Sequence, residues 1–444
     1  MARIGIYGGT FNPPHIGHLL AAEYAVDALC LEKLLLIPAC IAPHKQLPEN
    51  APTPAQRLEM VKLAAADNPR LTVSDIELAR GEVSYTYQTV EQLAAQYPGD
   101  ELLLFMGTDM FLSFQNWRYP ERILKKASLA VFYRGDPNEQ SLIAAQKALF
   151  EQQGATVYLV QNPVTDISST DVRRMLVFRC ASPFLHPAVE QYIREKGFYG
   201  TGQSYKNLSI DALQKVVVGL LNPNRVKHVL GCCETAYELA RIHGADETDA
   251  MRAALLHDIT KALDGPAQLT LCSAYGISLN DFSRQNPKTL HALTGALVAE
   301  RIFGENQEVV SAIRSHTTGK KQMNTLEKII YVADYMEPNR DFEGVEQLRA
   351  LAYENLDEAL KMGLNMTISL LKSQNREVSP ESVQALAWLQ KEGYEYVKCK
   401  RSSLCCNEGI RREEGYGHQA AANQRGILFG RLLFDLYRYF QYPR

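Results

Sequence analysis

The sequence predicts a chain of two folded parts, an α/β doubly wound parallel sheet followed by an all-α domain. Up to about Gly200, short apolar runs alternate with helical patterns, which indicates a parallel sheet with helices on both faces. Beyond Ser209 almost every segment has helical periodicity and strand patterns stop. We therefore expect domains at residues 1–199 and 209–398, a Gly/Ser-rich linker at 200–208, and a tail of unassigned structure at 399–444.

The first part contains six apolar runs, each rich enough in Leu, Ile, Val or aromatic residues to form a strand. The expected strands are Arg3–Tyr7, Lys33–Ala39, Leu71–Leu78, Glu101–Gly107, Ser128–Arg134 and Ala155–Val160. Amphipathic segments lie between them. In one of these, Thr53 can cap a helix and Pro54 fits its first turn.

The second part is expected to contain several short helices. One begins with Asn222 as its cap, followed by Pro223, and stops at Gly244. Another is expected from Asp249 to Gly265, before Pro266, so that the adjacent His257 and Asp258 lie within a helix. Adjacent helical residues point about 100° apart, so this pair can serve one site only if other helices contribute to it.

The composition is that of an ordinary soluble globular protein. Hydrophobic residues are 46%, charged residues are 22% and the net charge is −3. No basic stripe or long apolar run is present, so we expect neither a nucleic-acid nor a membrane partner. The nine cysteines are scattered and predict reduced thiols in a cytoplasmic protein. Homo-oligomerisation stays open.

The opening segment RIGIYGGTFNPPHIGH predicts an anion site. Gly8 and Gly9 let backbone amides approach a ligand closely, and a helix must begin near His15 because Pro13 and Pro14 precede it. His15 and His18 then share one face of the first turn. No carboxylate or thiol stands near them to complete a metal shell, so phosphate oxygens suit them better than a metal. Structural histidines that cap the loop are an equal alternative on spacing alone.

The loop fits neither GxGxxG nor GxxxxGK[ST], which disfavours a dinucleotide fold of the usual kind and a P-loop kinase. It resembles instead the Rossmann-like nucleotidyltransferase superfamily marked by an HxGH motif, here His15-Ile16-Gly17-His18. A second superfamily motif, ISSTxxR, occurs as ISSTDVR at Ile167–Arg173. The hydroxyls of Ser168, Ser169 and Thr170 lie at the expected start of a helix, and the Arg173 guanidinium can donate two hydrogen bonds to a phosphate.

Within this superfamily, residues 1–199 resemble the bacterial nicotinate-mononucleotide adenylyltransferases. The likeness is carried by GGTFNPPHIGHL, PACIAPHK, SYTYQT, FMGTDMFLSFQNW and ISSTDVRRML. The family transfers AMP from ATP, with magnesium on its phosphates, to nicotinate mononucleotide, and releases pyrophosphate. No covalent enzyme intermediate is implied, so catalysis rests on positioning and charge stabilisation.

The resemblance also implies residue roles. His15, His18, Lys45 and Arg173 would be catalytic through their contacts with ATP phosphates. The other ATP- and substrate-binding residues would be Gly8, Gly9, Thr10, Phe11, His44, Thr86, Gly107, Asp109, Trp117, Ile167, Ser168, Ser169 and Thr170. Among them, Gly107 and Asp109 would lie against the ribose, and Thr86 and Trp117 would hold the pyridine ring. Nicotinamide mononucleotide, pantetheine or glycerol compounds are alternative acceptors that HxGH alone does not separate.

Four histidines and two aspartates of the second part are candidate metal ligands at helical positions. They are His228, His257, Asp258, His291, His316 and Asp334. Imidazoles with few carboxylates suit iron, manganese or zinc better than calcium, and six ligands suggest two ions that share Asp258. Cys232 and Cys233 have core spacing and are interpreted as packing residues. Cys399, Cys405, Cys406 and His418 in the tail fit no zinc pattern.

The order of these ligands resembles the HD superfamily of metal-dependent phosphohydrolases. LLHDITK, RSHTTG and YVADYMEPNRDFEGVEQLR further resemble its YqeK branch, the symmetrical bis(5'-nucleosyl)-tetraphosphatases, over about residues 209–395. That family cleaves diadenosine tetraphosphate to two ADP. By resemblance, His228, His257, Asp258 and Asp334 hold one ion and His291 with His316 the other. Both ions are expected to be iron, with manganese as the alternative.

The same resemblance assigns Lys261, Thr317 and Arg340 to phosphate and Asp258 to catalysis. Two alternatives stay open for this half. It could hydrolyse a different nucleotide, such as a 5'-nucleotide or a guanosine alarmone, or it could sense nucleotides and regulate the transferase without turnover. All metal positions are filled, which argues against a pure sensor.

Overall fold

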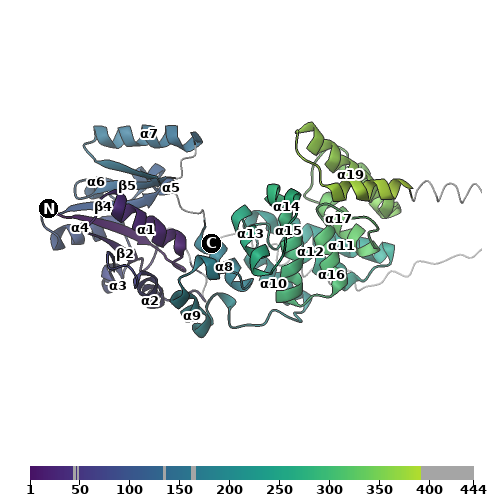
Figure 1. Cartoon of the computed structure of the whole chain (residues 1–444), viewed down its shortest axis with the longest axis horizontal. Coiled ribbons are helices and arrows are strands. Elements are labelled where there is room, and N and C mark those ends of the chain that lie inside the picture. The colour runs from purple at the N-terminus through teal and green to yellow at the C-terminus, as the bar shows by residue number, and fades with distance from the viewer. Residues whose placement is uncertain (44–46, 48–49, 134–136, 162–166, 392–444) are drawn as a thin grey trace, which may run out of the picture. The chain divides into compact units, whose positions relative to one another are not determined.

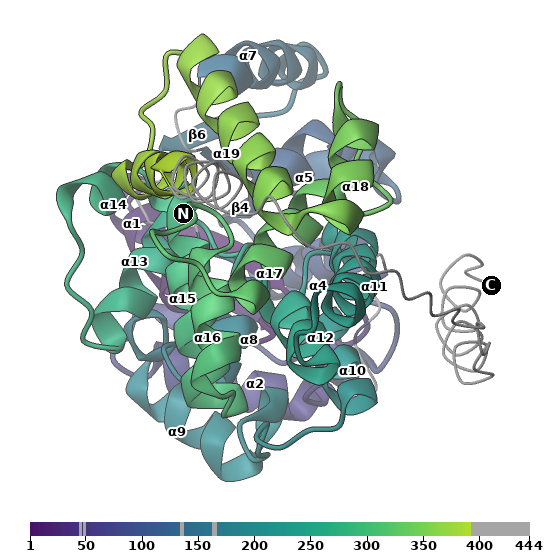
Figure 2. The same cartoon turned by 90° about the vertical axis from the view of Figure 1, so that its right-hand side faces the viewer.

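The computed structural model describes residues 1–43, 47, 50–133, 137–161 and 167–391 (Figures 1 and 2). The first part is a six-stranded parallel sheet in the order β3-β2-β1-β4-β5-β6. Its strands are β1 Arg3–Gly9, β2 Lys33–Pro38, β3 Leu71–Val73, β4 Glu101–Gly107, β5 Ser128–Tyr133 and β6 Val157–Gln161. The predicted doubly wound fold is therefore confirmed.

Helices cover both faces of the sheet, and Figure 1 shows α7 and α2 on opposite sides of it. The helices of this part are α1 Ile16–Ala28, α2 Pro54–Ala65, α3 Ile76–Arg80, α4 Thr86–Gln96, α5 Thr108–Leu112, α6 Pro120–Leu124, α7 Pro137–Gln152, α8 Ser169–Val177 and α9 Pro187–Lys196. Short 3₁₀ turns are η1 Phe114–Asn116, η2 Ser182–Phe184 and η3 Phe198–Gly200.

Alternation along each strand divides the core into two layers. Leu34, Leu36 and Phe105 point to the face packed by α1, α2, α8 and α9. Leu35, Ile37 and Leu104 point to the face packed by α4, α5, α6 and α7. Strands buried on both faces read as continuous apolar runs, which is why the sequence revealed them.

The second part is helical. It contains α10 Ile210–Leu220, η4 Pro223–Arg225, α11 Val226–His243, α12 Glu247–Leu256, α13 Gly265–Ala274, α14 Asp281–Gln285, η5 Pro287–Thr289, α15 Leu290–Val298, η6 Ala299–Phe303, α16 Gln307–Ser315, α17 Thr325–Met336, α18 Val345–Glu354 and α19 Leu356–Ser373. Helices α11, α12, α15, α16 and α17 pack together around its core (Figure 2).

Two expectations about element bounds are wrong. The strand expected over Leu71–Leu78 ends at Val73, because β2 offers pairing partners only to Leu71–Val73, and α3 follows. The helix expected to run from Asp249 to Gly265 ends at Leu256. Its last residues instead form a turn, and Asp264 caps a new helix that begins with Gly265 and Pro266. A proline fits the first turn of a helix, so the pair marks a start here.

Several local predictions are confirmed. Thr53 caps α2 in a capping box with Gln56. Asn222 caps η4, which leads into α11, and α11 stops at Gly244 in the left-handed conformation. The six cysteines within the described ranges are free thiols, as expected. Within the same ranges, every helix is too short or too polar to cross a membrane. The tail beyond Lys398, with its cysteines and His418, lies outside the described residues.

Candidate functional sites

The first candidate site lies at the carboxyl ends of β1 and β4, where the strand order reverses direction. Open α/β sheets bind ligands at this point. Helix α1 begins after β1 with His15 as its N-cap, and the His15 and His18 rings lie 3.7 Å apart. The His15 backbone N–H donates to Nδ1 of His18 at 3.2 Å. His18 therefore caps the loop, and both rings stand at a helix N-terminus.

Gly17 makes room for this pair. A Cβ at Gly17 would lie 3.1 Å from Nδ1 of His15 and 3.3 Å from Cγ2 of Ile167. His15 is buried, and burial lowers its pKa to about 4, so the imidazole is neutral at pH 7. Its buried Nδ1 has no hydrogen-bond partner among the described residues. The ring is thus held mainly by packing.

The ISSTDVR motif meets the histidine loop directly, although some 150 residues separate them. Ser168 caps α8 by accepting from the backbone N–H of Asp171. Oγ of Ser169 donates to the Pro13 carbonyl at 2.9 Å, and Arg173 donates to the Asn12 carbonyl at 2.7 Å. Arg173 also donates to Oγ1 of Thr170 at 2.9 Å. Two helix N-termini therefore converge with imidazoles, hydroxyls and a guanidinium, groups that can bind phosphate.

The remaining predicted residues of this half lie at the same end of the sheet or near it. Gly107 ends β4 and Asp109 is exposed in the first turn of α5. Thr86 begins α4, and the Trp117 ring packs 5.2 Å from that of Phe114. The Arg118 guanidinium lies 4.5 Å from the Tyr85 ring, so the segments that carry Thr86 and Trp117 are neighbours.

The loop that carries Gly8 and Gly9 is packed against a side chain at Gly9 and has free space at Gly8. The Phe11 ring is buried 3.1 Å from where a Cβ at Gly9 would lie, whereas a Cβ at Gly8 would meet nothing within 4 Å. His44 and Lys45 lie outside the described residues. His186 caps α9 and pairs with Asp67.

Two residues that hold the first site were missed by sequence reasoning. Arg57 is buried in α2 and donates to the carbonyls of Thr10, Ala39 and Cys40 at 2.7, 2.6 and 3.1 Å. The Tyr199 hydroxyl donates to Oδ1 of Asn12 at 2.6 Å. A basic residue on the otherwise apolar face of α2 was the available signal for Arg57. Tyr199 gave none, since it stands in a Gly-rich segment.

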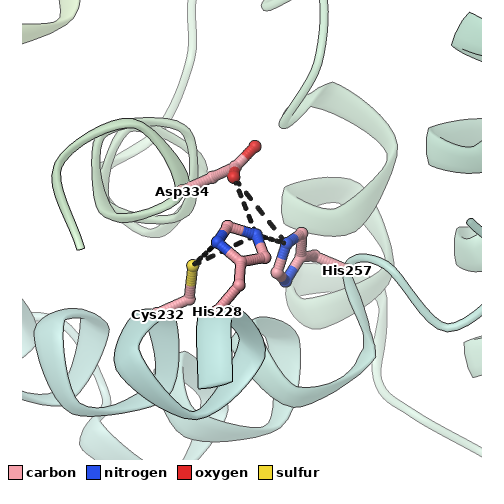
Figure 3. A group of neighbouring side chains, drawn as sticks. All are labelled: His228, Cys232, His257 and Asp334. Carbon is pink, nitrogen blue, oxygen red and sulfur yellow. Dashed lines mark hydrogen bonds and ion pairs between the residues drawn. The ribbon is translucent and has the colours of Figure 1, made fainter. Parts of the chain in front are cut away.

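The second candidate site gathers all six predicted metal ligands. Figure 3 shows three of them, His228, His257 and Asp334, beside Cys232. His228 comes from α11, Asp334 from α17 and His291 from the first turn of α15. His257 follows α12 and His316 follows α16, each as the C-cap, and Asp258 is in the turn after His257. The end of a helix lets His257 and Asp258 reach one site together, which adjacent residues inside a helix do poorly.

The four histidines share one orientation. Nδ1 of His257, His291 and His316 lies 2.7, 2.8 and 2.6 Å from the carbonyls of Ala254, Lys288 and Ile313. A carbonyl only accepts, so each Nδ1 carries the proton and each Nε2 offers a lone pair. Nε2 of His257 lies 3.3 Å from Nε2 of His228, and Nε2 of His291 lies 3.1 Å from Nε2 of His316. The lone pairs therefore converge as two pairs.

Asp258 joins the two histidine pairs. Its Oδ2 lies 3.6 Å from Nε2 of His228 and 3.4 Å from Nε2 of His257. Its Oδ1 lies 3.4 Å from Nε2 of His291 and 3.8 Å from Nε2 of His316. One carboxylate thus presents one oxygen to each pair. This geometry suits a bridging ligand between two cations.

Burial keeps two of the imidazoles in the neutral state that metal binding needs. Burial lowers the pKa of His316 to about 4, and burial with the nearby His316 lowers that of His291. Burial would raise the pKa of Asp334, but the adjacent imidazoles of His228 and His257 outweigh it and lower that pKa. Ligand atoms of His228, Cys232, His257 and Asp334 all lie within 4.8 Å of one another, as do those of His257, Asp258 and His316. The donors therefore fit divalent cations.

The three residues expected to contact phosphate line the same site. Nζ of Lys261 and Oγ1 of Thr317 lie 2.9 and 3.0 Å from Nε2 of His291. Arg340 donates to Oδ1 of Asp334 at 2.7 Å, so this guanidinium fixes a predicted ligand. A cavity of about 910 Å³ adjoins them and is lined by Lys261, His291, Thr317, Phe282 and Arg376, among others.

Three further side chains at this site were missed. The guanidinium of Arg225 contacts Oδ2 of Asp258. Sγ of Cys232, interpreted as packing, is buried as expected but also lies 3.7 Å from Nε2 of His228. Oε1 of Glu337 lies 3.2 Å from Nδ1 of His228. Arg225 and Glu337 each stand three residues from a predicted ligand, one helical turn away, and this spacing was the available signal.

Comparison with known proteins finds a separate family match for each of the two parts. Residues 6–175 match the cytidylyltransferase-like family model and residues 225–339 match the HD domain model. The first part is similar to probable nicotinate-nucleotide adenylyltransferases from Geotalea daltonii, 39% identical over 216 residues, and Exiguobacterium sibiricum, 36% identical over 200 residues. Each alignment covers 45% of this chain and 100% of the relative.

One solved structure covers the other part. It is described as a predicted HD superfamily hydrolase involved in NAD metabolism from Clostridium acetobutylicum. It is 36% identical, with a TM-score of 0.41, and the match covers 42% of this chain and 98% of that one.

Proposed function

From its membership of the nicotinate-nucleotide adenylyltransferase family, which covers 45% of its length, and from the HD domain that follows, we propose that the chain has two enzymatic activities. The N-terminal half transfers AMP from ATP to nicotinate mononucleotide. The helical half hydrolyses diadenosine tetraphosphate symmetrically to two ADP. Both reactions concern adenylylated phosphates, so their union in one chain is chemically coherent.

For the transferase, the observation that carries the proposal is the contact between the two motifs. The hydrogen bonds from Ser169 to Pro13 and from Arg173 to Asn12 fix two helix N-termini around one point. A triphosphate would be bound there by backbone N–H groups, hydroxyls and imidazoles. These groups stabilise charge without any covalent step.

The reaction needs no nucleophile from the enzyme. A phosphate oxygen of nicotinate mononucleotide attacks the α-phosphorus of ATP, the bond from that phosphorus to the bridging oxygen breaks, and pyrophosphate leaves. His15 and His18, with Lys45 and Arg173, would stabilise the negative charge that develops, with magnesium on the phosphates. Thr86 and Trp117 would hold the pyridine ring, Trp117 by stacking.

The acceptor is tested by supplying the intact chain with ATP and, in turn, nicotinate mononucleotide, nicotinamide mononucleotide and pantetheine phosphate, while pyrophosphate release is followed. We expect the highest kcat/KM with nicotinate mononucleotide and a loss of at least about tenfold in Trp117→Ala, because stacking on a base contributes about 1–3 kcal/mol. A preference for pantetheine phosphate, or full activity of Trp117→Ala, would contradict this acceptor.

For the helical half, the observation that carries the proposal is the split of the two Asp258 oxygens between two histidine pairs. His228, His257, Asp258 and Asp334 would hold one ion, and His291, His316 and Asp258 the other, with iron proposed first and manganese second. When bound, the ions supply positive charge to a phosphate and lower the pKa of water.

The chain's own residues would orient the substrate. Lys261 and Thr317 lie at the mouth of the 910 Å³ cavity, which is large enough for a nucleotide and is lined by further polar groups. Water adds to one phosphorus, the central bridging bond breaks and two ADP leave. Hydrolysis of another nucleotide remains the second candidate, because the same cavity would accept other phosphate esters.

The decisive experiment incubates the full chain, loaded with Fe²⁺ or Mn²⁺, with diadenosine tetraphosphate and separates the products. We expect ADP only, and loss of nearly all turnover in Asp258→Asn. ATP with AMP as products would contradict symmetrical cleavage. Turnover of 5'-nucleotides or guanosine alarmones in place of diadenosine tetraphosphate would favour the second candidate, and no turnover with metal bound would favour a sensor.

A further inference from the structure

Glu337 lies behind the helical site and does not face the point where the ligands converge. It is the C-cap of α17, three residues after Asp334, and its side chain is 1% exposed. Oε1 lies 3.2 Å from Nδ1 of His228. Oε2 accepts from the backbone N–H and Nδ2 of Asn339 at 2.7 and 2.8 Å. Both carboxylate oxygens are therefore engaged, and Asn339 fixes the one that His228 does not use.

Helix α11 is shaped to admit this carboxylate. A Cβ at Gly231 would lie 2.5 Å from Oε2 of Glu337 and 3.1 Å from Nδ2 of Asn339. No side chain larger than hydrogen fits at such a distance without a shift of the neighbouring atoms. Gly231 is one turn from His228, so the same helix face presents the imidazole and accepts the group that orients it.

The partner of Nδ1 differs among the four histidines of the site. His257, His291 and His316 each donate from Nδ1 to a backbone carbonyl. His228 alone among these four has a carboxylate there. A carboxylate polarises the imidazole more strongly than a neutral carbonyl, fixes the tautomer with the lone pair on Nε2, and makes that nitrogen a better ligand.

We propose that Glu337 is a positioning residue that makes the ion site of His228 and Asp334 the tighter of the two sites in the helical half. The inference rests on the proposed two-ion site. Nε2 of His228 lies 3.1 Å from Oδ1 of Asp334, so strengthening His228 acts on this ion position. At the ion site of His291 and His316, each imidazole Nδ1 donates only to a backbone carbonyl. We therefore expect this site to bind its ion less tightly and to lose it first.

The test measures Mn²⁺ binding to the full chain by the electron paramagnetic resonance signal of free Mn²⁺, so that turnover is not the readout. We expect two ions per chain with unequal Kd. In Glu337→Gln an amide N–H₂ replaces one acceptor beside the donors of Asn339, and the tighter Kd should weaken about 10–100-fold. The weaker Kd should change less than about threefold, since no backbone partner of the other histidines is altered.

Two variants separate positioning from folding. Glu327→Gln alters another buried glutamate of α17, bonded to Asn324 and Ser311, and should bind both ions as the unaltered chain does. Asn339→Ala removes one of the two donors that fix Oε2 and should weaken the tighter site to a lesser degree. A tighter Kd that is the same in Glu337→Gln as in the unaltered chain would overturn the role of Glu337, as would equal weakening in Glu327→Gln. Failure of the unaltered chain to bind Mn²⁺ would overturn the two-ion proposal itself.

Discussion

Gly17 illustrates how one missing side chain defines the first site. The HxGH motif needs a glycine at its third position here because a Cβ would press on the His15 ring and on Ile167. The restriction is steric and does not come from backbone strain, because Gly17 is an ordinary residue of α1. The spacing of the two histidines is thus only half of the motif, and the glycine between them is the other half.

Gly17→Ala is expected to reduce adenylyl transfer. The added methyl displaces the His15 ring, and overpacking of this kind costs about 1–3 kcal/mol, so kcat/KM should fall at least about tenfold. Pyrophosphate release gives the rate. The control is Gly219→Ala in α10, where a Cβ meets nothing within 4 Å and activity should not change. Equal activity of Gly17→Ala and the unaltered chain would show that the ring does not need this space.

His15 also gives the transferase half a dependence of stability on pH. Burial lowers its pKa from 6.5 to about 4 in the folded chain. Above pH 6.5 the imidazole is neutral in both states and contributes nothing. As the pH falls from 6.5 towards 4, the unfolded chain binds a proton that the folded chain does not, and the free energy of unfolding decreases.

We therefore compare His15→Asn with the unaltered chain by urea unfolding at pH 7 and pH 4.5. Both carry Trp388→Phe, so that Trp117 reports on the transferase half. Between these pH values the unaltered chain should lose about 2–3 kcal/mol more than His15→Asn. Parallel losses would mean that His15 titrates alike in the folded and unfolded states.

At the scale of elements, α2 acts as a brace for two loops of the first site. Its buried Arg57 bonds to carbonyls in the loops that follow β1 and β2. Neither loop has strand partners at these positions, so their carbonyls depend on this guanidinium. Helix α8 supplies a second brace through Arg173 and Ser169.

Arg57→Lys should loosen the first brace. A single ammonium keeps the charge but does not reproduce the fork that reaches three carbonyls. We expect the free energy of unfolding to fall by about 2–3 kcal/mol and the KM for ATP to rise. Arg70→Lys is the matched control, since Arg70 forms an exposed ion pair with Asp27 and should change neither quantity measurably. An unchanged KM in Arg57→Lys would contradict the brace.

Element bounds were predictable where the signal is local. The caps at Thr53, Asn222 and Gly244 depend on neighbours within a turn, and the sequence shows those neighbours. The end of α12 is different. It stops at Leu256 without a glycine or proline. In the buried turn that follows, Thr260 donates to the carbonyl of His291 and accepts at its own carbonyl from Gln268. Nothing local in the sequence announces such partners.

At the scale of the whole molecule, the two candidate sites offer different chemical groups. We therefore expect that each activity can be abolished without loss of the other. The first site has no carboxylate arranged as a metal ligand beside its histidines among the described residues, whereas the second consists of imidazoles joined by aspartates. Removal of tightly bound metal should therefore affect one reaction only.

We expect dialysis of the full chain against a strong chelator, followed by addition of Mg²⁺ alone, to restore adenylyl transfer fully. Hydrolysis of the dinucleoside tetraphosphate should stay at least about tenfold reduced until Fe²⁺ or Mn²⁺ is supplied, because Mg²⁺ prefers oxygen ligands to imidazole. Both rates are measured on one sample. Recovery of hydrolysis with Mg²⁺ alone would contradict a site built for transition metals.

The sequence by itself determined the fold class of both parts, because buried parallel strands and amphipathic helices have distinct periods and their turn residues are local. It also predicted the six side chains that the structure brings together in the helical half, since their residue types and order are distinctive. Only the tertiary structure decided how those ligands divide: which Asp258 oxygen faces which histidine pair, and which acceptor lies behind each imidazole. The supporting side chains of Arg57, Tyr199, Arg225 and Glu337 were likewise decided by contacts between distant segments, which no periodicity records.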